Sequence, residues 1–124
     1  MKILIKTGKH KIEAELFSNN TGQRIYEALP LKGTVNTWGD EIYFEVPVHV
    51  ELDDSAKEVV ELGDLGFWPA GNCFCIFFGK TPASKGDEIR PASAVNVFGK
   101  ITDNLEILKK FVDGDKIIVK NAYR

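Results

Sequence analysis

Residues 63–101 read GDLGFWPAGNCFCIFFGKTPASKGDEIRPASAVNVFGKI, and this stretch decides the fold class. Its two very apolar segments, 73–78 and 94–101, are predicted to be strands, and a loop containing Pro and Ser, 81–91, joins them. The stretch holds both cysteines and one of the two tryptophans, but it has no histidine and no nucleophile motif. A hydrophobic sheet bordered by aromatic loops is more typical of a binding surface than of a hydrolytic centre.

The segments outside this stretch add further short strands. Residues 3–6 and 11–17 alternate apolar and polar side chains and predict a β-hairpin. Residues 41–50 also alternate, with Ile42 and Phe44 on one face and Glu41 and Tyr43 on the other. Pro47 lacks an N–H group, so this strand is expected to stop, bulge or lie at an edge near it. Extended segments are also expected at 35–38, 59–60, 65–68 and 116–122.

Two short helices are expected between the strands. Asn20 with Gln23 resembles a capping box, and Pro30 ends the helix that follows it. Asp103 with Glu106 predicts a second capped helix. Many short strands with only two short helices favour a mainly β protein that closes into a barrel, because closure removes exposed sheet edges.

Length and composition restrict the protein class. The 124 residues are expected to form a single domain, 1–124, and 44% of them are apolar while 27% are charged. Sixteen basic and eighteen acidic side chains give a formal charge of −2, which does not favour nucleic acid or an anionic membrane as a partner. The N-terminal segment is interrupted by lysines, so a cytoplasmic location is expected.

The cysteines and histidines do not indicate a metal site. Cys73 and Cys75 are predicted to share one face of a strand at a spacing poor for a disulfide, so they are interpreted as reduced, small apolar side chains. His10 and His49 have no cysteine or paired carboxylate at ligand spacing. We therefore expect no metal and no cofactor.

The order of these segments resembles that of a known family. GDLGFWPAGNCFCIFFGKT followed by NVFGKITDNLEILKKF is similar to the second half of a cyclophilin. VNTWGDEIYF, taken with GDLGFWP and PASAVN, is more specifically similar to the small prokaryotic cyclophilin-like family, whose members mostly lack an assigned function. The resemblance covers almost the whole chain and implies a closed cyclophilin-like β-barrel.

The positions on which catalytic cyclophilins depend are not matched. Their essential arginine stabilises the twisting X-Pro amide, and Glu45 stands about where it is expected. An ionised carboxylate cannot donate a hydrogen bond to that amide. The active-site glutamine and phenylalanine of catalytic cyclophilins map onto Cys73 and Cys75. The tryptophan and histidine of their next loop have no counterpart in residues 81–91. Prolyl isomerase activity is therefore not expected.

Aromatic and polar side chains predict a groove. Tryptophans in loops mark binding surfaces when they cluster in a concave site, although Trp38 and Trp68 could instead plug the ends of the barrel. We expect a non-catalytic domain that binds a small molecule or a peptide. The alternatives are a divergent isomerase or other enzyme using Glu41 or Glu45, and a protein–protein interaction module that includes a homodimer. The candidate groove residues are Trp38, Glu41, Tyr43, Glu45, Trp68, Phe77 and Asn96.

Overall fold

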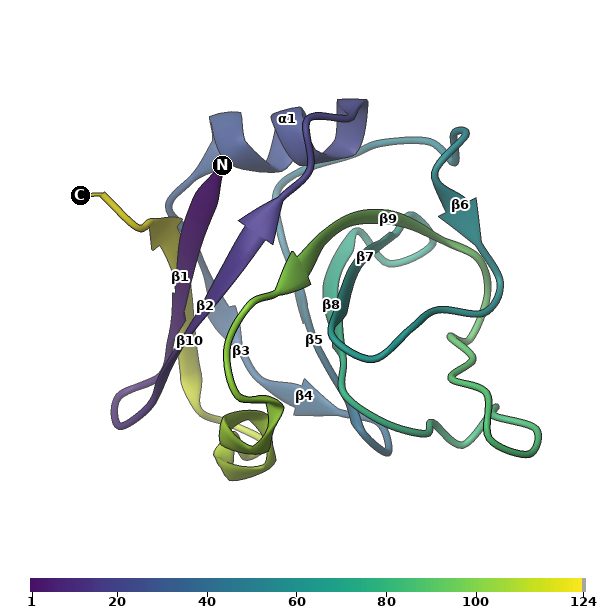
Figure 1. Ribbon diagram of the computed structural model, residues 1–124. Coiled ribbons are helices and arrows are strands. Elements are labelled where there is room, and N and C mark those ends of the chain that lie inside the picture. The colour runs from purple at the N-terminus through teal and green to yellow at the C-terminus, as the bar shows by residue number, and fades with distance from the viewer. Residues whose placement is uncertain (124) are drawn as a thin grey trace.

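The chain forms a strongly curled antiparallel sheet with a helix at each end (Figure 1). The computed structural model describes residues 1–123, so Arg124, the last residue of the predicted domain, lies outside the described residues. The strands are β1 (Lys2–Lys6), β2 (Lys11–Leu16), β3 (Leu31–Thr34), β4 (Asn36–Thr37), β5 (Glu41–Glu45), β6 (Ala56–Lys57), β7 (Asp64–Trp68), β8 (Cys73–Phe77), β9 (Val95–Ile101) and β10 (Lys116–Asn121). The helices are α1 (Asn20–Ala28) and the 3-10 helix η1 (Leu105–Lys110).

The sheet curls until its two ends meet. Its order is β3-β10-β1-β2-β9-β7-β8-β5-β4, with β6 paired to β9 outside this path. The end strands β3 and β4 are separated only by Val35, and β3 also contacts β5. This arrangement gives a nearly closed barrel with few unpaired edges. The predicted mainly β barrel with two short helices is confirmed, although η1 is a 3-10 helix.

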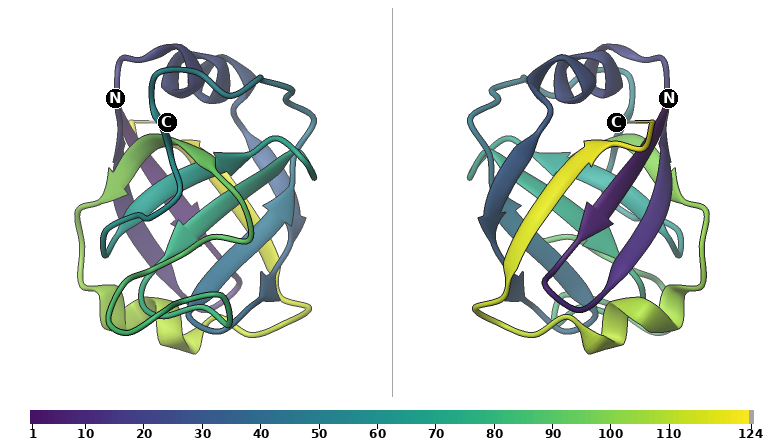
Figure 2. Two further views of the ribbon diagram at one scale, coloured as in Figure 1. Left: turned by 90° about the vertical axis from the view of Figure 1, so that its right-hand side faces the viewer. Right: turned by 90° about the vertical axis from the view of Figure 1, so that its left-hand side faces the viewer.

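Helix α1 covers one end of the barrel (Figures 1 and 2). The Asn19 side chain accepts a hydrogen bond from the Gly22 N–H at 2.9 Å and caps the helix. The sequence placed this cap one residue later, at Asn20, because two consecutive asparagines are both suitable capping residues. The helix ends before Pro30, as predicted, and Ile25 points into the core.

The 3-10 helix η1 covers the opposite end of the barrel (Figure 2). Its cap is Asn104, whose side chain accepts a hydrogen bond from the Glu106 N–H at 3.0 Å. The predicted cap was Asp103, one residue earlier. Leu108 and Phe111 are buried in the barrel core.

Strand β5 has the predicted alternation of side chains but is shorter than predicted. Ile42 and Phe44 are fully buried inside the barrel. The strand ends at Glu45, two residues before Pro47, which agrees with the predicted effect of a proline on strand pairing. The chain beyond continues to bury alternate valines without being part of the sheet.

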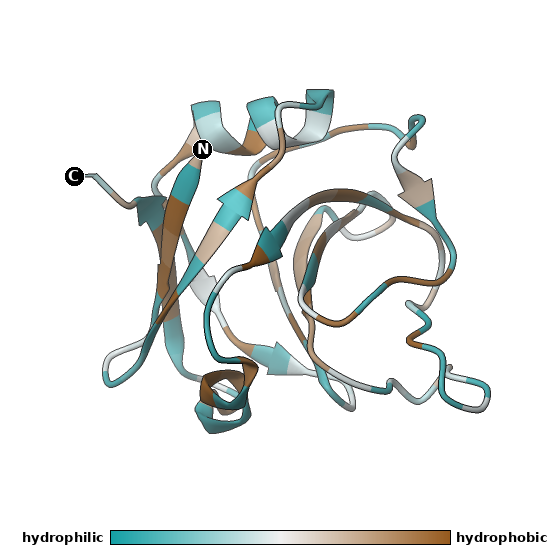
Figure 3. Ribbon diagram, viewed as in Figure 1, coloured by the Kyte–Doolittle hydropathy of each residue, from teal (hydrophilic) through white to brown (hydrophobic). Residues whose placement is uncertain are grey.

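Two apolar clusters lie on opposite sides of the sheet. The large one fills the barrel, where the Phe74 ring packs at 5.1 Å from that of Phe44 and at 5.0 Å from that of Phe98. The small one lies outside, on β8 and β9, and includes Phe77 and Ile89. The hydropathy colouring shows apolar stretches along β1 and β9 (Figure 3). A sheet that buries both faces explains why segments 73–78 and 94–101 are mostly apolar.

The shortest strands differ from the predictions. Strand β3 was not expected, because LKGT lacks an apolar alternation; it is positioned by pairing with β10. The strand expected at 59–60 is only an isolated bridge between Val60 and Ile89, and the strand of this region is β6. None of the helices within residues 1–123 is long and apolar enough to cross a membrane.

Candidate functional site

The outer face of β5 and β8 positions the candidate site. Because Ile42 and Phe44 point inward, their neighbours on β5 point outward. The antiparallel register then pairs Glu41 with Phe77 and Tyr43 with Cys75 across the two strands. The predicted parity of this strand is therefore confirmed.

Four of the predicted residues line one pocket on this face. The pocket has a volume of about 280 Å³, and its walls are Trp38, Glu41, Tyr43, Trp68 and Ala92. Both tryptophans are half-buried. They border an open concavity rather than plug the ends of the barrel, where α1 and η1 lie. Their role in binding remains a prediction.

A tight hairpin turn fixes Trp38 beside Glu41. The Trp38 N–H donates to the Glu41 carbonyl at 2.9 Å, and the Glu41 N–H donates back to the Trp38 carbonyl at 3.2 Å. The first turn residue, Gly39, has a φ of +61°, which glycine adopts at little cost in a two-residue hairpin. A Cβ atom there would approach the Lys80 carbonyl oxygen to 2.8 Å, so only glycine fits.

A hydrogen bond to the following loop orients Trp68. Its indole Nε1–H donates to the Ser93 hydroxyl at 2.6 Å. Ser93 belongs to the loop 78–94, which also contributes Ala92 to the pocket wall. The indole therefore connects the end of β7 to the loop that borders the pocket.

Glu41 is a buried carboxyl group in the wall of this pocket. Only 6% of its surface is exposed. Burial disfavours the charged form and raises the pKa of Glu41 to about 7, although the hydrogen bond from the Cys75 thiol opposes the shift. Glu41 is consequently about half ionised at neutral pH. A carboxyl group poised in this way in a cleft is typical of a functional site.

The neighbouring thiols stay protonated. Cys73 and Cys75 are both free and buried, as the sequence predicted. Burial, followed by the charge of Glu41, raises the pKa of the Cys75 thiol well above its usual range. Burial also raises the pKa of Cys73. Both side chains therefore act here as small apolar groups. The Cys75 thiol lies beside the Glu41 carboxyl group and the Cys73 carbonyl, the latter at 3.8 Å, and a thiol is a weak donor to either.

The other three predicted residues do not line the pocket. Glu45 lies on the same face but is exposed at the end of β5. Phe77 is fully buried in the outer apolar cluster, beneath the loop that carries Ile89. Asn96 is also fully buried, and its amide bonds the Asp53 N–H and the Glu51 carbonyl at 3.0 and 2.9 Å. It therefore secures the chain between β5 and β6.

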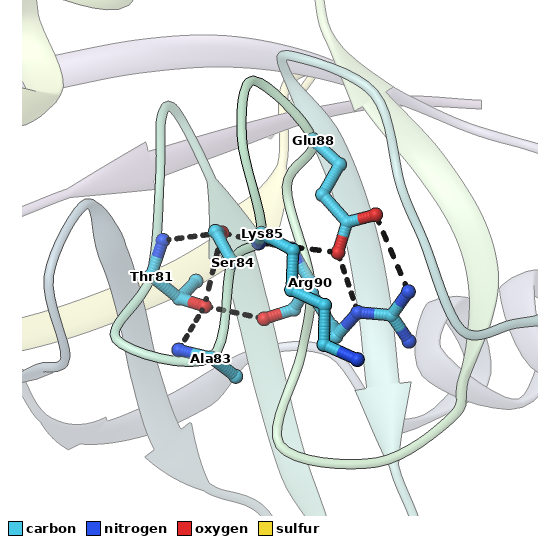
Figure 4. Close-up of polar contacts among 6 residues, drawn as sticks. All are labelled: Thr81, Ala83, Ser84, Lys85, Glu88 and Arg90. Carbon is cyan, nitrogen blue, oxygen red and sulfur yellow. Dashed lines mark hydrogen bonds and ion pairs between the residues drawn. The ribbon is translucent and has the colours of Figure 1, made fainter.

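The loop over the outer cluster is held by its own polar contacts (Figure 4). The Ser84 hydroxyl accepts hydrogen bonds from the Thr81 N–H at 3.0 Å and from the Arg90 N–H at 3.2 Å. The Thr81 hydroxyl donates to the Arg90 carbonyl. Glu88 forms a two-pronged ion pair with the Arg90 guanidinium. These contacts hold the loop in one conformation, and the loop contributes Ala92 to the wall of the pocket.

Sequence reasoning missed Ala92, Ser93 and Cys75. Cys75 had a usable signal, because strand parity places it on the face of β8 that lies opposite Tyr43. Ala92 and Ser93 had none, because the path of a long loop does not follow from its local composition.

Comparison with known proteins identifies the family. The model of the Cyclophilin-like family matches residues 1–120. The chain belongs to the cyclophilin-like family. It is also similar to the solution structure of the hypothetical protein AF2241 from Archaeoglobus fulgidus. Its sequence is 44% identical, the TM-score is 0.80, and the match covers 98% of this chain and 95% of that one.

A second solved structure shares the cyclophilin-like fold alone. McbB, solved in complex with tryptophan, is 10% identical with a TM-score of 0.75, and the match covers 98% of this chain and 45% of McbB. No curated protein matches the chain. Within residues 1–123 of this cyclophilin-like protein, no group of three or more His, Cys, Asp or Glu side chains has an arrangement suited to a metal ion.

Proposed function

We propose that this cyclophilin-like protein is a non-catalytic binding domain that takes a small organic molecule, or one side chain of a peptide, between Trp38 and Trp68. The observation that carries the proposal is a buried carboxyl group in a pocket with three aromatic walls. Burying Glu41 lowers stability at neutral pH, and such locally unfavourable choices in a folded protein concentrate at functional sites.

The dimensions of the pocket limit its occupant. Its volume of about 280 Å³ is just below the range of roughly 300–1,000 Å³ typical of pockets for drug-sized ligands. One ring or one side chain fits, whereas a dinucleotide cofactor does not. A larger hollow of about 560 Å³, lined by Tyr26, Pro30 and Lys120 among others, has no buried residue in its wall. It is therefore the weaker candidate despite its size.

Nuclear magnetic resonance of the two indole N–H groups tests the proposal. We expect at least one of benzylamine, benzyl alcohol, phenylacetate and the peptide Ala-Ala-Pro-Phe to shift the signals of Trp38 and Trp68 saturably. A dissociation constant of about 1 mM is reasonable for a ligand of eight or so heavy atoms. The variant Tyr26→Phe, in the larger hollow, should leave this titration unchanged. Saturable shifts around Tyr26, with both indole signals static, would contradict the proposal.

A protease-coupled isomerisation assay tests the catalytic alternative. We expect the protein to leave the cis–trans exchange of an Ala-Pro peptide at its spontaneous rate, because Glu45 offers no donor to the twisting amide. A catalytic cyclophilin assayed in parallel is the positive control. Accelerated exchange by the pure protein that persists in Glu45→Ala would show that our interpretation of strand β5 is wrong.

A further inference from the structure

The Glu41 carboxylate faces the pocket without a cationic partner. Glu41 takes part in none of the ion pairs formed among residues 1–123. The pocket walls contain neither lysine nor arginine. The Cys75 thiol is its hydrogen-bonding neighbour, and a thiol is a weak donor. When Glu41 is ionised, its buried charge therefore lacks the compensation that such charges normally have.

The remaining walls of the pocket are suited to a positive charge. Trp38, Tyr43 and Trp68 line the same pocket as the Glu41 carboxyl group. The faces of aromatic rings carry negative electrostatic potential and attract cations by about 0.5–2 kcal/mol each, most strongly in desolvated sites. Alkylated ammonium groups are favoured over a bare ammonium in such surroundings, because less hydration is lost on entry.

We propose that the pocket between Trp38 and Trp68 selects an alkylated ammonium group, which pairs with the Glu41 carboxylate and packs against the aromatic walls. This inference rests on the proposed binding function, since it names the chemical class bound at the same site. The group is carried either by a free small molecule or by a modified lysine side chain of a peptide.

We expect the affinity for the ammonium group to depend on pH through the ionisation of Glu41. The titratable groups around it are Tyr43 on β5 and the two thiols, Cys73 and Cys75, on β8, and the pKa of each thiol is raised. Glu45, further along β5, is exposed at the strand end. Glu41 is therefore expected to ionise between pH 6 and 8. With its pKa at about 7, the ionised fraction, and with it the affinity for a cation, increases about tenfold over this range.

A matched pair of probes tests the charge selectivity. Choline and 3,3-dimethylbutan-1-ol have nearly the same shape, but only choline is charged. In indole titrations at pH 8 and constant ionic strength, we expect choline to bind at least about tenfold more tightly than the alcohol. Glu41→Gln should remove this preference. Glu61→Gln, which removes an exposed carboxylate outside the pocket, should retain it.

The outcomes separate the inference from the proposed function. If the alcohol shifts both indole signals as strongly as choline, the pocket binds ligands but the cation inference is overturned. A choline affinity that is unchanged by Glu41→Gln, or that does not vary with pH, also overturns it. If choline leaves the indoles static while a compound of the panel above shifts them, only the binding function survives.

A separate experiment tests whether the ammonium group is carried by a peptide. A Gly-Ser-Lys-Ser-Gly peptide carrying trimethyllysine is compared with the same peptide carrying norleucine. Tighter binding of the trimethyllysine peptide than of choline identifies a peptide ligand, and equal or weaker binding identifies a free small molecule. A norleucine peptide that binds as tightly as the trimethyllysine one would overturn the proposal.

Discussion

The free energy of unfolding of the wild type is expected to fall by about 3 kcal/mol between pH 4 and pH 8 because of Glu41, and Glu41→Gln is expected to remove this fall. Burial raises the pKa of Glu41 from 4.5 to about 7, so the folded protein holds this proton more tightly than the unfolded chain. Each pKa unit corresponds to about 1.4 kcal/mol. The stabilising contribution of the protonated form is complete below pH 4.5, decreases as the pH rises through 7, and is absent above it.

Urea denaturation at pH 4, 6 and 8 measures this effect. Wild type and Glu41→Gln should have similar free energies of unfolding at pH 4, and the variant should be more stable by about 3 kcal/mol at pH 8. Glu61→Gln is the matched control, because Glu61 is exposed and should follow the wild-type curve. Parallel curves for the wild type and Glu41→Gln would mean that Glu41 titrates as an ordinary surface carboxyl group.

Asn96→Leu is expected to lower the free energy of unfolding by about 3 kcal/mol or more. The Asn96 amide bonds the Asp53 N–H, the Glu51 carbonyl and the Thr21 hydroxyl, the last at 3.2 Å. Leucine has a similar size but cannot replace any of these bonds. Each partner left without a hydrogen bond away from water costs about 1–3 kcal/mol.

The matched control for this substitution is Asn36→Leu. Asn36 also donates to backbone carbonyls, at 3.3 and 3.4 Å, but it is exposed, so water replaces its bonds. We expect a cost of about 0.5 kcal/mol or less from chemical denaturation. Equal costs for the two variants would show that Asn96 does not hold the segment between β5 and β6.

The barrel and the orientation of β5 could be predicted because strand periodicity is a local signal. The alternation of Ile42 and Phe44 with Glu41 and Tyr43 fixes which side chains point outward, whatever the partner strands are. The position of Trp38 follows similarly, since Gly39-Asp40 is recognisable as a hairpin turn. Four of the residues predicted from such local signals line one pocket in the structure.

Asn96 and Phe77 could not be placed from the sequence, because both lie on strands that are buried on both faces. On β9, Val95 and Val97 belong to the outer cluster while Phe98 belongs to the barrel core, so both faces of the strand carry buried apolar side chains. The inward orientation of Asn96 depends on partners from distant segments. Phe77 does face outward with Glu41, but the loop covering it follows a path that no local pattern specifies.

Titration of the Glu41 side-chain carboxyl carbon by ¹³C magnetic resonance tests the account most directly, and the signal is assigned by its loss in Glu41→Gln. We predict a pKa of about 7 in the free protein, because the carboxyl group is buried in the pocket wall. Saturating choline should lower this pKa, since the cation stabilises the carboxylate. A midpoint near 4.5, unaffected by choline, would contradict the claim that the pocket lined by Trp38, Tyr43 and Trp68 presents a buried acidic group to a ligand.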